Sequence, residues 1–328
     1  MNENSIPEIE LSLDRPQLDL SLDGKDMDIS ATNEIVEVAN ASPSVSSPSV
    51  SSVTDTSQDT TTASDDDDVN DIVVSDKSSP IIMLFGPRSS GKSMTLVRLA
   101  RYLRSKGYTI KTDFTFRSDP DYRKKCDEFE KNLDTRDALP GNAYTDFLLL
   151  KVSKQGRTIC QFLEAPGEHY FDPEKIGAEN FPPYMTEIIR TLKNRKIWVF
   201  IAEAKWYVNP KTRAAYVGRI RKCKDVLVKP KDRFIILYNK IDQRDELFRN
   251  GRIIPKAAER TMREEYDGLA DAFKNNNPTT SLWRDCDYSF VPFCTGYYSM
   301  SGNKLKYTPS EDHYPAKLWK RLLKCIKG

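Results

Sequence analysis

The sequence predicts an α/β domain with a mostly parallel sheet and helices on both faces, preceded by a disordered tail. Short apolar runs suited to buried strands alternate with helical segments over residues 79–328. Such alternation is typical of parallel strands joined by crossover helices.

The charge also divides the chain: residues 1–78 hold 18 of the 48 acidic side chains and three of the 50 basic ones, a net charge of −15. The remaining 47 basic and 30 acidic residues give the body a net charge of +17.

Composition predicts that residues 1–78 are an acidic, Ser/Thr-rich, disordered tail. Residues 41–64 contain 14 Ser or Thr, and the run Asp65–Asp68 follows. Such a segment has too little apolar surface to offset the entropy of ordering. Within it, Leu11-Ser-Leu-Asp14 recurs as Leu20-Ser-Leu-Asp23. The repeat is either a strand-forming ligand for a sheet edge or a slightly hydrophobic stretch of the tail.

Several protein classes are excluded by simple counts. Residues 1–8 show no secretory signal, and the apolar runs Ile81–Phe85 and Ile197–Ala202 are much shorter than the 18 or so residues of a membrane span. The six cysteines form no C-x-x-C pair and the chain has only two histidines, which argues against a zinc site or a disulfide framework. We expect a soluble protein of a reducing compartment, the cytoplasm.

The first functional motif is Gly86-Pro-Arg-Ser-Ser-Gly-Lys-Ser93, which matches G-x-x-x-x-G-K-[ST]. It follows the strand-like run Ile81–Phe85 and precedes a periodic helix, Met94–Lys106, which is the context this motif requires. Backbone N–H groups of such a loop wrap phosphates. The expected nucleotide contacts come from Gly86, Ser89, Ser90, Gly91 and Lys92, with the Ser93 hydroxyl on Mg²⁺. The motif predicts binding of a nucleoside triphosphate.

A second motif indicates which nucleotide is bound. The strand-like run Phe234–Tyr238 ends in Asn239-Lys-Ile-Asp242. Here the sequence resembles the P-loop GTPases, whose N-K-x-D motif lies at the end of such a strand. The resemblance implies that Asp242 accepts hydrogen bonds from guanine N1–H and the exocyclic amine, that Asn239 braces the loop, and that the Lys240 stem covers the base.

Between these motifs, Glu164-Ala-Pro-Gly167 looks like the D-x-x-G segment of GTPases. The resemblance implies that the Gly167 N–H meets the γ-phosphate and that Glu164 meets the Mg²⁺ shell. Glu164 replaces the Asp of the family, which puts the catalytic rate in question more than binding. The water-positioning residue of the family corresponds to Glu168, and His169 is the next candidate, unless it is an ordinary loop histidine.

The order of elements resembles the Ras-like branch of P-loop NTPases. Two strand-like runs, residues 145–152 and 158–163, are separated by a turn signal and form the expected hairpin before Glu164. Further strands are expected at residues 196–202 and 288–294, and helices near residues 183–194, 211–227, 257–273 and 315–326. Thr295, after the last strand, is expected to contact the base.

The first switch region is expected to be enlarged, over residues 108–144. The second Mg²⁺ ligand implied by the family is assigned to Thr145, which lies 53 residues after Lys92. The intervening chain includes a strand-like stretch, Tyr108–Arg117, and a helix-compatible one, Asp121–Asn132. The alternative ligands are Thr112, Thr115 and Thr135. The candidates for an arginine finger are Arg88, Arg117 and Arg136, although a solvated surface charge is the preferred interpretation of each.

Two further stretches have more than one interpretation. Residues 211–233 hold nine Lys or Arg against Asp225 and Asp232, which fits a nucleic-acid contact, a dock for the acidic tail, or a solvated helix face. No interleaved aromatic residues support nucleic-acid binding. The apolar face of residues 318–326 fits a membrane surface, but a final helix packed on the sheet explains the same spacing and is preferred.

The sequence therefore predicts a GTP-binding protein that hydrolyses GTP to GDP with Mg²⁺, slowly alone and faster with a protein partner. The rival hypothesis is a nucleotide-gated scaffold that binds GTP without hydrolysing it. Glu164 and Glu168 are the residues that keep this rival open. A third hypothesis, an ATPase or small-molecule kinase, requires the N-K-x-D match to be accidental.

Overall fold

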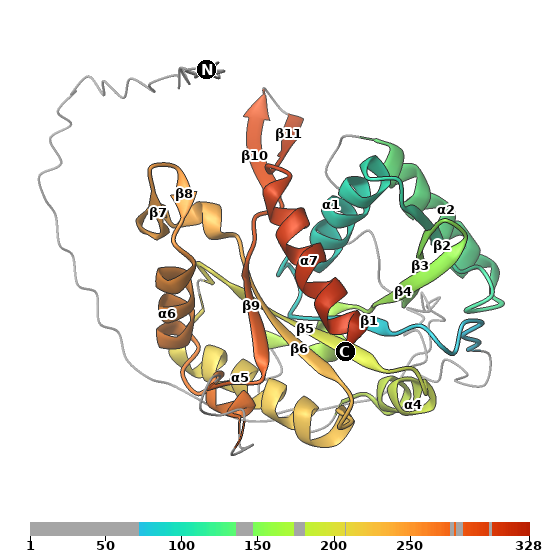
Figure 1. The fold of residues 1–328 in the computed structure, drawn as a ribbon, viewed down its shortest axis with the longest axis horizontal. Coiled ribbons are helices and arrows are strands. Elements are labelled where there is room, and N and C mark those ends of the chain that lie inside the picture. Colours follow the sequence, from blue (N-terminus) through green and yellow to red (C-terminus); the bar gives the residue numbers. More distant parts are fainter. Residues whose placement is uncertain are drawn as a thin grey trace, which may run out of the picture. The chain divides into compact units, whose positions relative to one another are not determined.

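The described chain is built on one seven-stranded sheet (Figure 1). The computed structural model describes residues 72–135, 147–173, 181–206, 208–275, 279, 285–301 and 304–328. The strand order is β2-β3-β4-β1-β5-β6-β9. The bounds are β1 Ile81–Phe85, β2 Thr109–Thr112, β3 Leu148–Lys154, β4 Arg157–Glu164, β5 Lys196–Glu203, β6 Arg233–Asn239 and β9 Tyr288–Pro292. From β4 to β9 all neighbours are parallel, whereas β3 is antiparallel to both β2 and β4. The predicted mostly parallel sheet of Ras-like order is confirmed.

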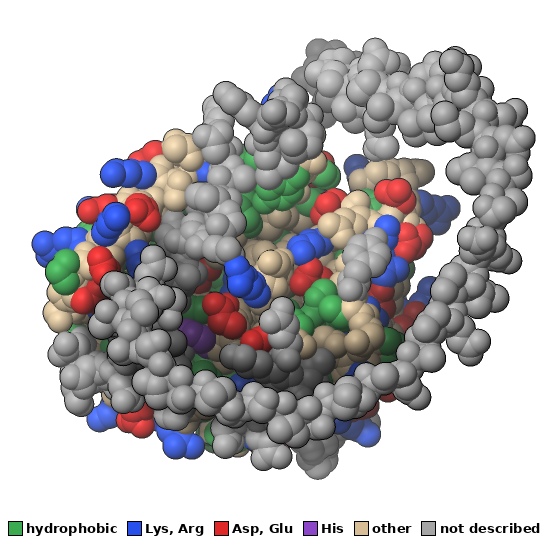
Figure 2. Space-filling model, turned by 180° about the vertical axis from the view of Figure 1, so that it is seen from behind, with side chains coloured by type: hydrophobic (Ala, Val, Ile, Leu, Met, Phe, Trp, Pro, Cys, Tyr) green, Lys and Arg blue, Asp and Glu red, His purple; other side chains and the backbone are tan. Residues whose placement is uncertain are grey.

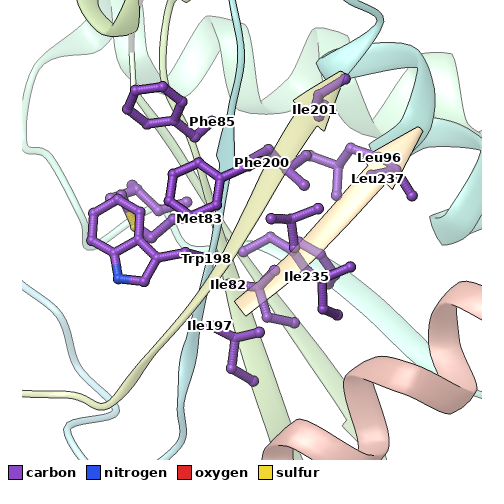
Figure 3. Close-up of a cluster of buried hydrophobic side chains, with 14 of the residues drawn as sticks. Ile82, Met83, Phe85, Leu96, Ile197, Trp198, Phe200, Ile201, Ile235 and Leu237 are labelled. Carbon is purple, nitrogen blue, oxygen red and sulfur yellow. The ribbon is translucent and has the colours of Figure 1, made fainter. Parts of the chain in front are cut away.

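The central strands are buried on both faces, and the two faces differ in chemistry. In β5, Trp198 and Phe200 point to one face while Ile197 and Ile201 point to the other (Figure 3). On the aromatic face the Phe85 ring lies 5.2 Å from the Phe200 ring. The period of two along a strand explains this division, because successive side chains leave opposite faces of the sheet.

Each face is covered by its own helices. The main helices are α1 Lys92–Ser105, α2 Pro120–Asp134, α4 Pro183–Thr191, α5 Pro210–Leu227, α6 Pro255–Glu265 and α7 His313–Lys327. Leu96 of α1 lies on the other, aliphatic face, to which Ile197 and Ile201 point (Figure 3). Helix α7 packs beside α1 on this face (Figure 1). Tyr216 of α5 lies on the aromatic face, with its ring 6.3 Å from that of Phe85. Helices on both faces were predicted and are found.

The region after α1 contains regular structure. Strand β2 extends the sheet beyond β3. Asp119 caps the N-terminus of α2, and its carboxylate accepts a hydrogen bond from Tyr122 N at 2.6 Å. The β3–β4 hairpin turns at Gln155 and Gly156, with φ of 50° and 75°. Two successive positive φ angles are typical of a tight hairpin turn whose twist matches the strands. Residues 136–146 lie outside the described chain.

The folded body begins before the predicted boundary at residue 79. Val74 is buried, and the Val73 N–H donates a hydrogen bond to Phe116 O at 3.0 Å. The Asp76 carbonyl accepts hydrogen bonds from Gln161 Nε2 at 2.9 Å and Asn194 Nδ2 at 2.8 Å. Residues 72–78 therefore belong to the domain, because they satisfy buried amide groups of β4 and of the loop before β5. The rest of the predicted tail, including both copies of its repeat, lies outside the described residues.

Three elements differ from expectation. Helix α6 ends at Glu265 and not near residue 273, because the chain turns at Gly268, where φ is 73°. A hairpin of β10 (Gly296–Ser301) and β11 (Lys304–Pro309) follows the last sheet strand, and a small one joins β7 (Phe248–Arg249) to β8 (Arg252–Ile253). Neither hairpin was predicted, since their alternation is short and polar.

The basic stretch of residues 211–233 is not a uniformly solvated face. The Arg219 guanidinium lies 3.7 Å from the centre of the Phe181 ring, and Arg213 and Lys224 lie over the rings of Tyr266 and Phe273. Several of these cations therefore cover aromatic side chains. On the face shown in Figure 2, acidic and basic side chains are interspersed, with no block of one sign.

The C-terminal helix packs on the sheet, as preferred. Leu318, Trp319 and Leu322 of α7 are buried against the core. Among the described residues, no helix is both long and apolar enough to cross a membrane.

Candidate functional site

The loops that carry the sequence motifs gather at one edge of the sheet. Strands β1, β4, β5, β6 and β9 run parallel, so the loops that follow them emerge at the same edge. Ligands of open α/β sheets bind in the crevice outside these carboxyl ends. The four loops are residues 86–91, 164–167, 239–242 and 293–295.

The loop after β1 has the backbone expected of a phosphate cradle. Gly91 has φ of 89° and Ser89 has φ of 63°, so two left-handed residues shape the turn before α1. A Cβ on Gly91 would lie 2.5 Å from Asn239 Nδ2. Glycine is therefore required at this position both by conformation and by the close approach of β6.

Lys92 is buried in this loop. Its ammonium donates hydrogen bonds to Gly86 O at 3.1 Å and Pro87 O at 3.0 Å. Burial lowers the pKa of Lys92 to about 8, an effect opposed by the charges of Glu164, Glu168 and Glu203. The ammonium thus lies on the carbonyls that line the cradle, at the place where phosphate oxygens would be its natural partners.

The residues assigned to Mg²⁺ meet next to Lys92. The Ser93 hydroxyl donates a short hydrogen bond to Glu164 Oε1. The second oxygen, Glu164 Oε2, is buried and has no hydrogen-bond partner among the described residues. Burial raises the pKa of Glu164, opposed by the Ser93 hydrogen bond and the charge of Lys92. A buried carboxylate oxygen without a donor, beside a hydroxyl, suits a hard cation such as Mg²⁺.

The segment after β4 touches the phosphate loop directly. A Cβ on Gly167 would lie 2.4 Å from Arg88 N and 2.6 Å from Lys92 Nζ. Glu168 is exposed, yet its charge acts on Lys92. His169 is half-buried, with its ring 6.0 Å from that of Phe147. Gly167 therefore adjoins the cradle, while the two predicted water-positioning side chains follow it on the short helix α3, Gly167–Tyr170.

The loop after β6 is joined to the phosphate loop. Asn239 is fully buried, and its Nδ2 donates a hydrogen bond to Ser90 O at 2.9 Å. The Lys240 ammonium donates to Ser89 O at 2.9 Å and forms an ion pair with Glu203. The bracing role expected of Asn239 is thus matched by a direct contact, and Lys240 reaches the same loop.

Sequence reasoning missed Glu203, the last residue of β5. Its side chain is only 6% exposed, and burial raises its pKa, opposed by the charges of Lys240 and Lys92. Tyr266 fixes its backbone: the Glu203 N–H donates to the Tyr266 hydroxyl at 2.8 Å, and that hydroxyl donates to Glu203 O at 3.0 Å. The available signal was a charged residue directly after an apolar strand run.

Asp242 lies beside the loop after β9. The Cys294 thiol donates a hydrogen bond to Gly296 O at 3.8 Å, and burial, followed by the nearby charge of Asp242, raises the pKa of Cys294. Thr295 is buried, and its carbonyl accepts a hydrogen bond from the Tyr307 hydroxyl at 2.7 Å. The unpredicted β10–β11 hairpin therefore holds the predicted base-contacting loop in place, and Cys294 is a second residue that sequence reasoning missed.

Most of the remaining candidates that the structure describes are engaged with neighbouring residues near β2 and α2. Thr145 and Arg136 lie outside the described residues. Thr112 donates to Glu130 at 2.7 Å and Thr115 donates to Asp113 at 2.7 Å, so both hydroxyls are engaged between β2 and α2. The Thr135 hydroxyl bonds Asn132 O, and Arg117 pairs with Asp119. Arg88 is exposed on the phosphate loop.

The strand order and the meeting of these motif loops at one sheet edge decide the fold class. The fold is that of a P-loop GTPase domain. No family model and no curated protein matches the chain. Among solved structures, the chain is similar to the Roco2 protein of Methanosarcina barkeri bound to GDP, at 13% identity over 76% of this chain and 50% of that chain, with a TM-score of 0.34.

Two further solved structures are similar to this GTPase fold. One is a signal recognition particle receptor complex of Chaetomium thermophilum with GTP, at 13% identity over 75% of this chain and 97% of that chain, with a TM-score of 0.37. The other is a chloroplast translocon component, at 12% identity over 77% and 84%, with a TM-score of 0.42. At these scores the assignment rests on the strand order and the motif geometry.

Proposed function

We propose that the chain binds guanine nucleotide and hydrolyses GTP to GDP with Mg²⁺, as a slow switch whose rate depends on a protein partner. The main support for this proposal is the hydrogen bond from Asn239 Nδ2 to Ser90 O, at 2.9 Å. It joins the loop that reads the base to the loop that holds the phosphates, so one nucleotide can occupy both. The cytoplasm remains the expected compartment.

The residues present divide the work of binding. The left-handed turn at Ser89 and Gly91 presents backbone N–H groups to the phosphates, and Lys92 supplies the positive charge. Asp242 would accept the paired donors of guanine, next to Thr295. Adenine offers an acceptor where guanine has N1–H, so the same carboxylate would repel it. This favours GTP over ATP and argues against the ATPase or kinase hypothesis.

Ser93 and Glu164 would hold Mg²⁺. When bound, the metal would neutralise charge on the phosphates during transfer. Lys92 stabilises the same charge, and Gly167 keeps the chain close enough for its N–H to meet a γ-phosphate. Because little covalent chemistry is needed, positioning and electrostatics would supply most of the rate.

The non-hydrolysing scaffold remains the second candidate, and one observation favours it. Glu168 follows the glycine of the switch segment, and its charge already acts on Lys92. A carboxylate at this position repels the γ-phosphate and is poorly suited to orient the attacking water. On this hypothesis a partner reads the bound nucleotide, and turnover is negligible.

Base recognition is tested by competition and by a specificity switch. Excess ATP should fail to displace labelled GDP from the wild-type chain. Asp242→Asn should weaken GDP binding by about 1–3 kcal/mol, because the new side-chain amide N–H would face the N–H donors of guanine. The same variant should favour xanthine nucleotides. Unchanged GDP affinity in this variant would contradict the proposal. Single-turnover hydrolysis with quantified bound nucleotide then separates the enzyme from the scaffold.

A further inference from the structure

A groove runs along the outer edge of β9, far from any role in nucleotide binding assigned above. Strand β9 is the last strand of the sheet and lies between α6 and α7 (Figure 1). The groove has a volume of about 850 Å³ and is lined by β9, by the first turn of α6 and by one side of α7. Within the described residues, no strand pairs with this edge of β9. Unpaired N–H and C=O groups at a sheet edge are a template for another strand.

The groove has an excess of positive charge. Lys317, Arg321 and Lys324 of α7 line one side, and Lys256 of α6 and Arg233 of β6 line the rest. The four cations of α6 and α7 that line the groove, Lys256, Lys317, Arg321 and Lys324, form no ion pair with the described part of the chain. Burial lowers the pKa of Lys317, and the neighbouring charge of Arg321 lowers it further. These cations repel one another and would be stabilised by an acidic ligand.

The carboxylates in the groove do not neutralise this charge. Asp232 accepts hydrogen bonds from Lys196 N at 2.9 Å and Trp198 Nε1 at 3.0 Å. Glu259 accepts from Arg263 at 3.1 Å and Tyr288 at 2.9 Å. Asp287 is the third acidic residue and is exposed. Two of the three are thus committed to their own neighbours.

The chain itself carries a ligand of matching chemistry, twice. Pro7-Glu-Ile-Glu-Leu-Ser-Leu-Asp14 is followed nine residues later by Pro16-Gln-Leu-Asp-Leu-Ser-Leu-Asp23. Both copies alternate apolar and polar residues, so an extended copy has a Leu/Ile face and a face with two carboxylates and a serine. Six residues of strand span about 20 Å, and β9 has five residues.

We propose that the groove beside β9 binds this repeat of the same chain, residues 9–14 or 18–23, as an added strand. Backbone hydrogen bonds to the edge of β9 would give affinity, and the acidic face would meet Lys317, Arg321 and Lys324. The connection from residue 24 to residue 71 would span about 40 Å as a random coil, enough to reach across a domain of this size. None of the motif residues lines the groove, so the proposal can fail without affecting the proposed function.

Photocrosslinking in the full chain locates the repeat. A photoreactive phenylalanine derivative replaces Ser12 or, separately, Ser21, and mass spectrometry maps the products; the control carries it at Ser49, outside the repeat. Crosslinks from positions 12 and 21 are expected in β9, in residues 255–259 or in residues 317–325. Crosslinks elsewhere, or no more than from Ser49, overturn the proposal. Crosslinks found only between differently labelled chains also overturn it and assign the site to a second copy.

A charge reversal tests the chemistry with a matched control. Lys317→Glu/Arg321→Glu should lower the crosslinking yield several-fold, because it removes cations that face the groove. Lys320→Glu/Lys327→Glu makes the same change in net charge on exposed positions of α7 outside the groove lining, and should leave the yield unchanged. In the groove variant, Asp14→Lys/Asp23→Lys should restore the yield. Equal yields in the two pairs, or no rescue, overturn the electrostatic part of the proposal, and unchanged GDP affinity shows that each variant is folded.

Discussion

The Ser93 hydroxyl donates a hydrogen bond to the Glu164 carboxylate, so the residue after the phosphate-loop lysine meets the carboxylate at the end of β4. Ser93 lies in the first turn of α1, which follows β1, and Glu164 ends β4, the parallel neighbour of β1. Glu164 therefore reaches from the end of β4 to the hydroxyl that follows the phosphate-loop lysine. One carboxylate oxygen is occupied by Ser93, and the other has no donor among the described residues.

Ser93→Ala should abolish most Mg²⁺-dependent turnover. We expect single-turnover GTP hydrolysis to fall by about a hundredfold, because the variant removes the hydroxyl that we propose holds Mg²⁺ against the phosphates. The control is Ser90→Ala, which removes a buried hydroxyl of the same loop that has no partner among the described residues. Equal rates in the two variants would contradict the assignment of Ser93.

GDP affinity should depend on pH through Lys92. The pKa of this buried lysine is about 8 in the nucleotide-free structure, and bound phosphates would raise it. Above pH 8 the free protein has lost a proton that the complex retains, so binding must take up a proton and the Kd rises with pH, by up to about tenfold per unit. Calorimetry between pH 7 and 9 measures this. Lys92→Arg stays charged and should remove the dependence; a Kd for wild type that stays flat over this range argues against the assignment.

Glu203→Gln should weaken the link between the base loop and the phosphate loop. The variant leaves Lys240 without its ion pair and, since Lys240 is 30% exposed, we expect the free energy of unfolding to fall by about 1–2 kcal/mol. GDP release should also accelerate, as followed by stopped-flow fluorescence. Glu246→Gln removes an exposed carboxylate that pairs with Arg244 and should change stability by less than about 0.5 kcal/mol. If both variants release GDP at the wild-type rate, Glu203 has no positioning role.

Two Gly→Ala substitutions should have opposite effects. In Gly167→Ala the new Cβ would lie 2.4 Å from Arg88 N, so the phosphate loop must shift and nucleotide affinity should fall about tenfold or more. Gly218→Ala, in an exposed position of α5 with no atom within 4 Å of the new Cβ, should stabilise the protein by about 0.5–1 kcal/mol. Urea denaturation and GDP titration measure both. Wild-type affinity in Gly167→Ala would show that the loop tolerates the displacement.

Two truncations should separate the tail from the domain. A chain that starts at Ile72 should lose only what the docked repeat contributes to stability, whereas one that starts at Ser79 should lose about 3 kcal/mol or more in addition. The longer deletion exposes the site of Val74 and leaves the Asn194 and Gln161 amides without the Asp76 carbonyl. The unfolding midpoints in urea compare the two. Equal unfolding midpoints would instead support the predicted domain boundary at residue 79.

Local patterns predicted much of this fold. The apolar run of β1, the eight-residue loop motif and the periodic helix α1 are contiguous, and each is specified by neighbours in sequence. The same holds for the β3–β4 turn at Gln155 and Gly156, because a hairpin turn depends on the conformational freedom of two adjacent residues. Contacts made within a few residues leave a readable signal in the sequence.

The sequence by itself determined the elements, the phosphate loop and the candidate base-reading residues. Only the tertiary structure decided that Glu203 pairs with Lys240, that the charge of Asp242 acts on Cys294, and that residues 72–78 belong to the domain. Each of these relationships joins residues that are distant in sequence and near in space. Which of these groups are buried and paired depends on the spatial order of the strands in the sheet, and no local sequence pattern encodes that order.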